Sequence, residues 1–294
     1  MHKTLFVNTK PRESNLAKKL FQFRIVNSAF DGFLPGVKFL GKWGENTQLT
    51  LKDGTSLNYF SAIDAYSTSV YYFLANRLEN YSQSELIDIR RLSETLKNEL
   101  QMVFTQDEIS GVATGASAYF NPTLLALYAT IRLTKPEIVV QTGVASGVSS
   151  SLLLLAVEKN SKGRLIDIDL PNREKGGYQY ADGTVDRVYT PEGKEPGWLI
   201  PRELRGRWEL RLGSSREVLP KIEKCDVFYH DSEHSYTNMM FEYEWAYTRL
   251  PNLGILASDD IGWNNSWFDF HTKRPEMFPL LGRLFFGISQ KHAV

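Results

Sequence analysis

The sequence predicts a doubly wound, mostly parallel α/β sheet that follows a smaller N-terminal extension. From about residue 138 onward, short apolar runs typical of buried strands alternate with segments that have the apolar spacing of helices. Strands that alternate with helices pair in parallel, because a right-handed crossover needs a helix between neighbouring strands. We therefore place the extension at residues 1–112 and the sheet domain at residues 113–294.

The extension is predicted to be helical, with one hairpin. Residues 14–25 have apolar side chains at helical spacing. Between residues 47 and 60, apolar and polar residues alternate on both sides of Asp53-Gly54, a pair typical of a hairpin turn. Residues 84–104 place apolar side chains at spacings of three, four and seven, which predicts a long amphipathic helix. The sequence identifies no chemistry in this extension, which is a candidate surface for assembly into a homo-oligomer.

The elements of the sheet domain follow in order. Asn121-Pro122 places a capping residue before a proline, the usual start of a helix, and leads into an apolar segment that ends at Leu133. Helices are also expected from Ser149 onward and through Trp245. Strands are expected at residues 138–140, 164–168, 208–212, 226–229, 255–257 and 285–290.

Composition and charge exclude several classes of function. The chain has 34 Lys and Arg against 34 Asp and Glu, whereas domains that bind nucleic acid or an anionic membrane carry a basic excess. Its single cysteine, Cys225, cannot form an intramolecular disulfide, which favours a reducing compartment. No apolar run resembles a signal peptide or approaches the roughly 20 residues of a membrane helix. We expect a cytoplasmic protein with neither a nucleic-acid nor a membrane partner.

Glycines follow the first strand of the predicted sheet. Gly143 and Gly147 would let the backbone turn tightly and approach a ligand, and the next helix points its first N–H groups at the same place. Asp169 ends the second strand, where a carboxylate suits the two hydroxyl groups of a ribose. A purely structural turn and an exposed aspartate without a ligand are the alternatives.

Three carboxylates end two further strands. Asp231 follows one strand, and Asp259 and Asp260 follow the next, which the topology makes its neighbour. Crowded carboxylates are costly unless a cation compensates them. Oxygen ligands favour a hard ion, Mg²⁺ first, with Mn²⁺ or Ca²⁺ as alternatives. Solvated or helix-capping aspartates are the competing interpretation.

Three segments together resemble a known family. They are Gln141-x-Gly-x-x-x-Gly-x-Ser149, Gly163 to Asp169, and Leu212-Gly-Ser-Ser-Arg-Glu-Val-Leu-Pro220. Over roughly residues 115–290 the chain resembles the class I S-adenosylmethionine (SAM)-dependent methyltransferases, above all the divalent-metal-dependent O-methyltransferases of catechol and macrolide-sugar type. The resemblance implies a Rossmann-like sheet with an antiparallel last strand, and a small-molecule hydroxyl acceptor of sugar or natural-product type.

The resemblance also implies roles for individual residues. The glycine turn would hold the methionine part of SAM, Asp169 the ribose, and Ser214 and Ser215 would line the adenine. The positions that would contact SAM are Gln141, Gly143, Ala145, Gly147, Ser149, Asp169, Ser214, Ser215 and Asp231. Those that would hold the metal are Asp231, Asp259 and Asp260. His234 matches the general base, and imidazole suits that role because it titrates near neutral pH. The family usually has Asp or Glu where this chain has Gln141, whose carbonyl accepts a hydrogen bond but carries no charge.

Other functions fit parts of the pattern. A SAM- and metal-binding relative of hydroxylase type, or one without catalysis, would share the same framework. A nicotinamide-dependent oxidoreductase would also use a glycine turn and a strand-end acid, but it does not explain three aspartates. His230-Asp-Ser-Glu-His234 matches the H-x-x-E-H zinc-protease pattern, which requires both histidines on one face of a helix. A strand-like run precedes them here, so we favour the O-methyltransferase.

Overall fold

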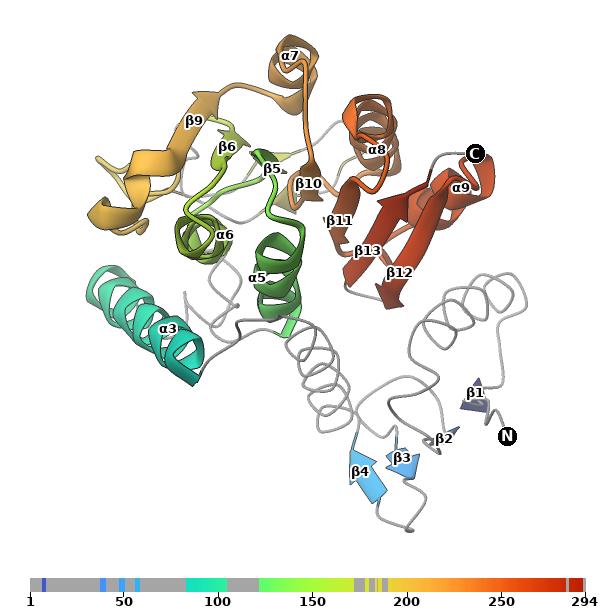
Figure 1. Cartoon of the computed structure of the whole chain (residues 1–294), viewed down its shortest axis with the longest axis horizontal. Helices are drawn as coiled ribbons and strands as arrows, with labels where there is room; N and C mark the ends of the chain where they lie inside the picture. Colours follow the sequence, from blue (N-terminus) through green and yellow to red (C-terminus); the bar gives the residue numbers. More distant parts are fainter. Residues whose placement is uncertain are drawn as a thin grey trace.

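A seven-stranded sheet forms the centre of the computed structural model (Figure 1). The structure describes residues 7–8, 38–40, 48–50, 56–58, 83–104, 122–171, 178–179, 183, 185–186, 190–283 and 286–292. The strands lie in the order β12 (Met277–Arg283), β13 (Phe286–Lys291), β11 (Ile255–Asp259), β10 (Val227–His230), β5 (Ile138–Thr142), β6 (Arg164–Asp169) and β9 (Trp208–Leu212). All pairs from β11 to β9 are parallel, whereas β13 is antiparallel to both of its neighbours. The predicted doubly wound, mostly parallel sheet with an antiparallel last strand is confirmed.

Helices cover both faces of this sheet. On one face, α5 (Pro122–Thr134) and α6 (Val148–Lys159) pack on inward side chains such as Val139 and Leu165. On the other face, α8 (Tyr236–Arg249) and α9 (Ser266–Lys273) pack on side chains such as Val140 and Ile166. Neighbouring residues of one strand point to opposite faces, so each strand of the centre is apolar on both sides. This burial explains the continuous apolar runs in the sequence.

The predicted amphipathic helix of the extension is α3 (Gln83–Val103), which belongs to the same core as α5 and α6. Its residue Glu85 is buried and accepts hydrogen bonds from Tyr128 Oη at 2.7 Å and from Arg132 Nη2 at 2.7 Å. Burial alone would raise the pKa of Glu85, but these two partners hold it below its ordinary value. The helix is thereby joined to α5 by polar as well as apolar contacts, while the domain boundary near residue 112 stays a prediction.

The predicted hairpin of the extension is confirmed by its backbone pairing. Strand β3 (Gln48–Thr50) pairs antiparallel with β4 (Ser56–Asn58), and β2 (Lys38–Leu40) pairs antiparallel with β3. A fourth strand, β1 (Val7–Asn8), lies parallel to β2. The helix predicted at residues 14–25 falls outside the described residues.

Several elements were not predicted. They include α9 and β12, which come after the last aspartates, and the short elements β7 (Tyr178–Gln179), β8 (Val185–Asp186), η1 (Arg202–Arg207), α7 (Ser215–Val218) and η2 (Leu219–Lys221). Strand β12 contains Pro279 and a register shift between Pro279 and Leu281, so its sequence lacks the alternation of a regular strand. As an edge strand it tolerates both features.

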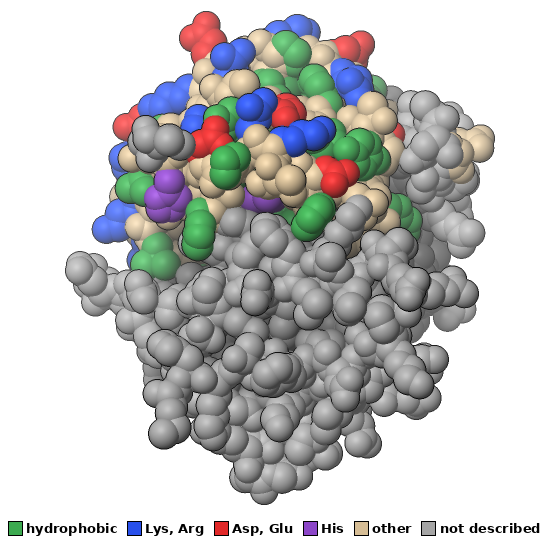
Figure 2. Space-filling model, turned by 90° about the vertical axis from the view of Figure 1, so that its right-hand side faces the viewer, with side chains coloured by type: hydrophobic (Ala, Val, Ile, Leu, Met, Phe, Trp, Pro, Cys, Tyr) green, Lys and Arg blue, Asp and Glu red, His purple; other side chains and the backbone are tan. Residues whose placement is uncertain are grey.

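The surface beside this edge of the sheet carries mixed charges. In Figure 2, basic and acidic side chains alternate over the described part of the face rather than gathering by sign, as the balanced composition leads one to expect. A helix of the length and hydropathy needed to cross a bilayer does not occur among the described residues.

Candidate functional site

A tight turn joins β5 to α6 at the carboxyl edge of the sheet. Gly143 has φ +80°, and a Cβ atom at this position would lie 1.9 Å from the backbone oxygen of Asp231. Only glycine therefore allows β5 and β10 to approach so closely at their ends. The Gly143 N–H donates to Ile168 O at 2.9 Å, and the Asp231 N–H donates to Thr142 O at 2.9 Å. These bonds tie the ends of three neighbouring strands together.

Gln141 lies beneath this turn and is fully buried. Its Nε2 donates to Gly143 O at 2.9 Å and contacts Ser149 Oγ at 3.0 Å and Ser150 Oγ at 3.1 Å. Because Gly143 O can only accept, the amide nitrogen must face it. The Gln141 Oε1 atom has no hydrogen-bond partner in the described part of the chain. A buried acceptor without a partner beside a glycine turn fits the ammonium group of an amino-acid ligand.

Asp169 closes the turn from the end of β6. Its Oδ2 accepts hydrogen bonds from the backbone N–H groups of Val144 at 2.9 Å and Ala145 at 2.8 Å, and Oδ1 accepts from Leu170 N at 2.7 Å. The carboxylate thus supports the turn, a role that sequence reasoning did not foresee. The contact between Asp169 and a ribose stays a prediction.

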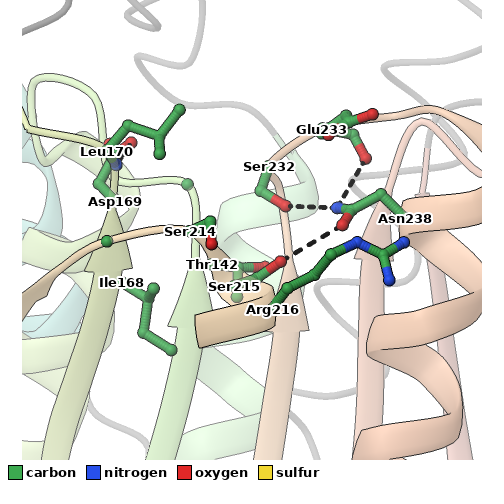
Figure 3. Close-up of a pocket in the computed structure, with 12 residues that line it drawn as sticks. Thr142, Ile168, Asp169, Leu170, Ser214, Ser215, Arg216, Ser232, Glu233 and Asn238 are labelled. Atoms are coloured by element: carbon green, nitrogen blue, oxygen red, sulfur yellow. Dashed lines mark hydrogen bonds between the residues drawn. The ribbon is translucent and has the colours of Figure 1, made fainter. Parts of the chain in front are cut away.

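A pocket opens over the ends of β5, β6 and β9 (Figure 3). The residues that line it are Thr142, Gly143, Ile168, Asp169, Leu170, Gly213, Ser214, Ser215, Arg216, Ser232, Glu233 and Asn238. Four of the predicted SAM-contacting residues are among them: Gly143, Asp169, Ser214 and Ser215. Gln141, Ala145, Gly147, Ser149 and Asp231 are not, although Gly147 caps α6 with φ +92° and Ala145 sits in the turn with φ +48°.

The three predicted metal-binding aspartates lie at the ends of the adjacent strands β10 and β11. Tyr229 Oη donates to Asp231 Oδ2 at 3.2 Å, and the side chains of Asp231 and Asp259 lie close enough to influence each other's pKa. Burial, together with the neighbouring carboxylates, raises the pKa values of both Asp231 and Asp259. The pKa of Tyr229 is raised by burial and by all three aspartates, which places Asp260 in the same neighbourhood.

This cluster fits a divalent cation in its chemistry but not in its present geometry. Carboxylate oxygens are the ligands of hard ions, and crowded like charges raise pKa values until a cation compensates them. Among the described residues, however, no group of three or more His, Cys, Asp and Glu side chains is arranged to hold a metal ion. The metal therefore stays a prediction that needs a test.

His234 lies beside the aspartates, as predicted. Its Nε2 is 4.0 Å from Asp231 Oδ1 and has no hydrogen-bond partner in the described part of the chain. Its ring packs edge-on against His230, with centroids 5.1 Å apart. Burial lowers the pKa of His234 to about 3, so the imidazole is uncharged at neutral pH and able to accept a proton. A pKa so low also makes it a weak base.

The structure contradicts the zinc-protease interpretation of His230 and His234. His230 is the last residue of β10, and His234 lies in the loop before α8. The two histidines are therefore not one turn apart on a helix, as that chemistry requires. His230 is instead buried, with Nδ1 2.6 Å from Glu242 Oε2.

Glu242 is the main residue that sequence reasoning missed. It is fully buried on α8, and its carboxylate contacts Thr142, His230, Ser232 and Asn238, of which all but His230 line the pocket. One signal was present in the sequence. Glu242 stands between Met239 and Ala246 on the apolar face of its helix, where a charged residue needs buried partners.

Comparisons with known proteins agree with this framework. A family profile described as "Methyltransferase domain" matches residues 140–261, which include both the glycine turn and the aspartates. Over this segment the chain is similar to a methyltransferase domain, in agreement with the predicted resemblance to the class I SAM-dependent methyltransferases. No curated protein matches the sequence.

Solved structures of methyltransferases are similar to this chain at low sequence identity. The O-methyltransferase NovP superposes with a TM-score of 0.50 at 13% identity, over 71% of this chain and 99% of NovP. The Podospora anserina methyltransferase PaMTH1, solved with bound SAH, gives 0.47 at 14% identity, over 69% of this chain and 87% of PaMTH1. The O-methyltransferase from Bacillus cereus, solved in complex with SAH, gives 0.46 at 14% identity, over 67% of this chain and 90% of that protein.

Proposed function

We propose that this chain is a SAM-dependent O-methyltransferase that acts on a hydroxyl group of a small molecule, of sugar or natural-product type. The observation that carries the proposal is the position of Gly143, which joins the glycine turn to the carboxylate cluster. A turn with an unpartnered buried acceptor, Gln141 Oε1, lies against the backbone of Asp231, which belongs to the carboxylate cluster. Donor binding and acceptor activation would thus take place side by side.

The donor half of the site would hold SAM. Gln141 Oε1 would accept a hydrogen bond from the ammonium group, and the N–H groups at the start of α6 face the turn. Ser214 and Ser215 line the pocket next to Asp169, where the nucleoside part would lie. When bound, SAM supplies a methyl group activated by the sulfonium charge, so positioning provides much of the rate. SAH-bound PaMTH1 and Bacillus cereus O-methyltransferase support this choice of cofactor.

The acceptor half would use Asp231, Asp259 and Asp260 to hold Mg²⁺, with Mn²⁺ or Ca²⁺ as alternatives. All three carboxylates have raised pKa values, chiefly because of burial and, for Asp231 and Asp259, also because of neighbouring carboxylates, and a cation would offset that repulsion. A bound divalent ion lowers the pKa of a hydroxyl group near it. His234 Nε2 is uncharged and unpartnered, and it would accept the proton that the hydroxyl group loses.

Calorimetry tests the proposal at the binding step. We expect SAM and SAH to bind the full chain and NAD not to bind, with Mg²⁺ binding seen separately. Tighter binding of NAD than of SAM would contradict the proposal and favour an oxidoreductase. SAM binding without SAH formation across a panel of phenolic and sugar acceptors would favour the non-catalytic or hydroxylase-type relative.

Activity assays test the residue roles. We expect Asp231→Ala and Asp260→Ala to lose metal-dependent SAH formation, and full turnover in excess EDTA would rule out the metal. His234→Ala should lower turnover while leaving SAM affinity unchanged. An unchanged pH–rate profile in His234→Ala would rule out His234 as the base.

A further inference from the structure

Beneath the pocket lies a carboxylate with every acceptor position in use. Glu242 Oε2 accepts from Thr142 Oγ1 at 2.6 Å and contacts His230 Nδ1 at 2.6 Å. Glu242 Oε1 accepts from Ser232 Oγ at 2.8 Å and from Asn238 Nδ2 at 2.9 Å. Two bonds to each oxygen fill the usual capacity of a carboxylate. The network ties β5, β10 and α8 together directly under the pocket.

This network fixes which way the amide of Asn238 faces. Its Nδ2 donates to Glu242 Oε1 and also lies 3.2 Å from the backbone oxygen of Glu233. A carboxylate and a backbone carbonyl can only accept, so the amide nitrogen must face them and the flipped amide is excluded. The amide oxygen then faces Ser215, whose Oγ donates to it at 3.3 Å (Figure 3).

One acceptor position of that oxygen remains for a ligand. A carbonyl oxygen accepts two hydrogen bonds, and within the described part of the chain Ser215 supplies a single long one. Asn238 is buried and lines the pocket together with Ser215 and Ser232. The pocket therefore presents an acceptor that cannot turn into a donor. Such a group matches an amino group of a ligand and repels a carbonyl oxygen.

We propose that Asn238 selects a 6-aminopurine over a 6-oxopurine in the nucleoside part of the cofactor, and that Glu242 is the positioning residue that holds the Asn238 amide in the selecting orientation. This inference rests on the proposed use of SAM. It assigns the base-recognising contact to α8, in addition to the serines after β9. A site that hydrogen-bonds one ligand group rejects an analogue that lacks it, because its own buried polar atom is then left unpaired.

The experiment compares two nucleosides on the full chain by calorimetry. S-adenosylhomocysteine carries the 6-amino group, and S-inosylhomocysteine carries a 6-oxo group in its place. We expect wild-type protein to bind the adenosyl compound at least about tenfold more tightly. Asn238→Ala should bring the two affinities to within about threefold, because the selecting oxygen is gone.

Two further variants separate selection from simple damage to the pocket. Glu242→Gln no longer presents an obligatory acceptor, so only the longer contact with Glu233 O would hold the Asn238 amide, and we expect the preference for the adenosyl compound to narrow. Thr237→Ala is the matched control, because Thr237 is the exposed neighbour of Asn238 on α8 and does not line the pocket. It should change both affinities by the same factor and leave their ratio as in wild type.

The outcomes distinguish this inference from the proposed function. Equal binding of the two compounds by wild-type protein would overturn the inference while SAM use stands. An unchanged ratio in Asn238→Ala would do the same, whether or not Glu242→Gln folds. Failure of wild-type protein to bind either compound would overturn the proposed function and the inference together.

Discussion

Glu242 lies close to Asp231 and Asp259 in this site, but the groups that surround these carboxylates differ. Burial alone would raise the pKa of Glu242, but His230, Thr142 and other polar partners outweigh it and lower that pKa to about 2. Asp231 and Asp259 face each other instead, and their pKa values are raised. Burial acts to raise the pKa of all three carboxylates, so it does not account for the difference between Glu242 and the aspartates. The groups that face each carboxylate decide it.

The contrast separates a preorganised part of the site from a part that a ligand would order. The Glu242 network fixes the orientation of the side chains under the pocket, so a nucleoside would bind against side chains that do not reorient. Among the described residues the aspartates face one another, Tyr229 and an uncharged His234 rather than a cationic side chain, and the cluster would gain its order from a cation. The following predictions test this division.

The largest effect is expected at Gly143, which joins the two halves. In Gly143→Ala, the new Cβ would lie 1.9 Å from Asp231 O, so β5 and β10 must separate at their ends. We expect SAH affinity to fall more than about 100-fold, which corresponds to about 2.7 kcal/mol. Calorimetry gives the affinity and a thermal melt gives the stability.

Gly193→Ala is the matched control for backbone strain. Gly193 also has a positive φ, +73°, but a Cβ there would meet nothing within 4 Å. It should lower stability by about 1–2 kcal/mol for the left-handed backbone and leave SAH binding unchanged. Equal loss of binding in both variants would show that strain, rather than the contact between Gly143 and Asp231, accounts for the effect.

The next effect is expected from Glu242→Gln. Removing the charge from a fully bonded buried carboxylate should lower the free energy of unfolding by about 2–4 kcal/mol at pH 7. The folded-state pKa is about 2, below the ordinary 4.5. The carboxylate therefore contributes stability that is present above about pH 4.5 and is lost as the pH falls toward 2. Wild-type stability should decline over that window more steeply than that of the variant.

The same helix offers a control for Glu242→Gln. Glu244 pairs with Arg274 at 2.7 Å, but both side chains are about one-third exposed. Glu244→Gln should cost less than about 1 kcal/mol, because solvent screens an exposed pair. If both variants lose the same stability, the Glu242 network is no stronger than a surface ion pair, and the comparison fails.

The third effect is expected from Mg²⁺ and Asp259→Asn. Mg²⁺ at 100 times its dissociation constant should stabilise wild-type protein by about 2.7 kcal/mol. Asp259→Asn removes one of the facing charges, so it should melt at a higher temperature than wild type without Mg²⁺ and respond little when Mg²⁺ is added. A lower melting temperature of the variant without Mg²⁺ would show that the aspartates do not repel each other.

The sequence allowed most of the fold to be predicted, for a physical reason. Central strands such as β5 and β10 are buried on both faces, so their sequences are continuously apolar and hard to mistake. Edge strand β12 is not constrained in this way. Its proline and register shift interrupt the alternation that predicts a strand, so the sequence did not reveal it. The hairpin of β3 and β4 was recognised because its turn residues are local.

The site was predicted only where residues follow strand ends. Asp231 and Asp259 could be placed together, because parallel strands bring their carboxyl ends to one edge. Glu242 is 100 residues away from Thr142, and no local pattern reports such a bond. The two bonds from Asp169 Oδ2 to the glycine turn also depend on side-chain direction, which spacing does not determine.

The smallest effect is expected from Asp167→Asn. Asp167 is a further buried carboxylate, whose partners are intermediate between those of Glu242 and those of the aspartate cluster. Asp167 Oδ2 accepts from Trp208 Nε1 at 2.7 Å, but Oδ1 has no partner among the described residues, and burial raises the pKa to about 7. Since the folded-state pKa lies above the ordinary 3.8, Asp167 should cost stability as the pH rises from about 4 through 7. The asparagine variant should therefore gain on wild type by a few degrees in melting temperature between pH 5 and pH 8. A constant difference across that range would mean that the bond from Trp208 suffices to keep Asp167 ionised, as four contacts do for Glu242.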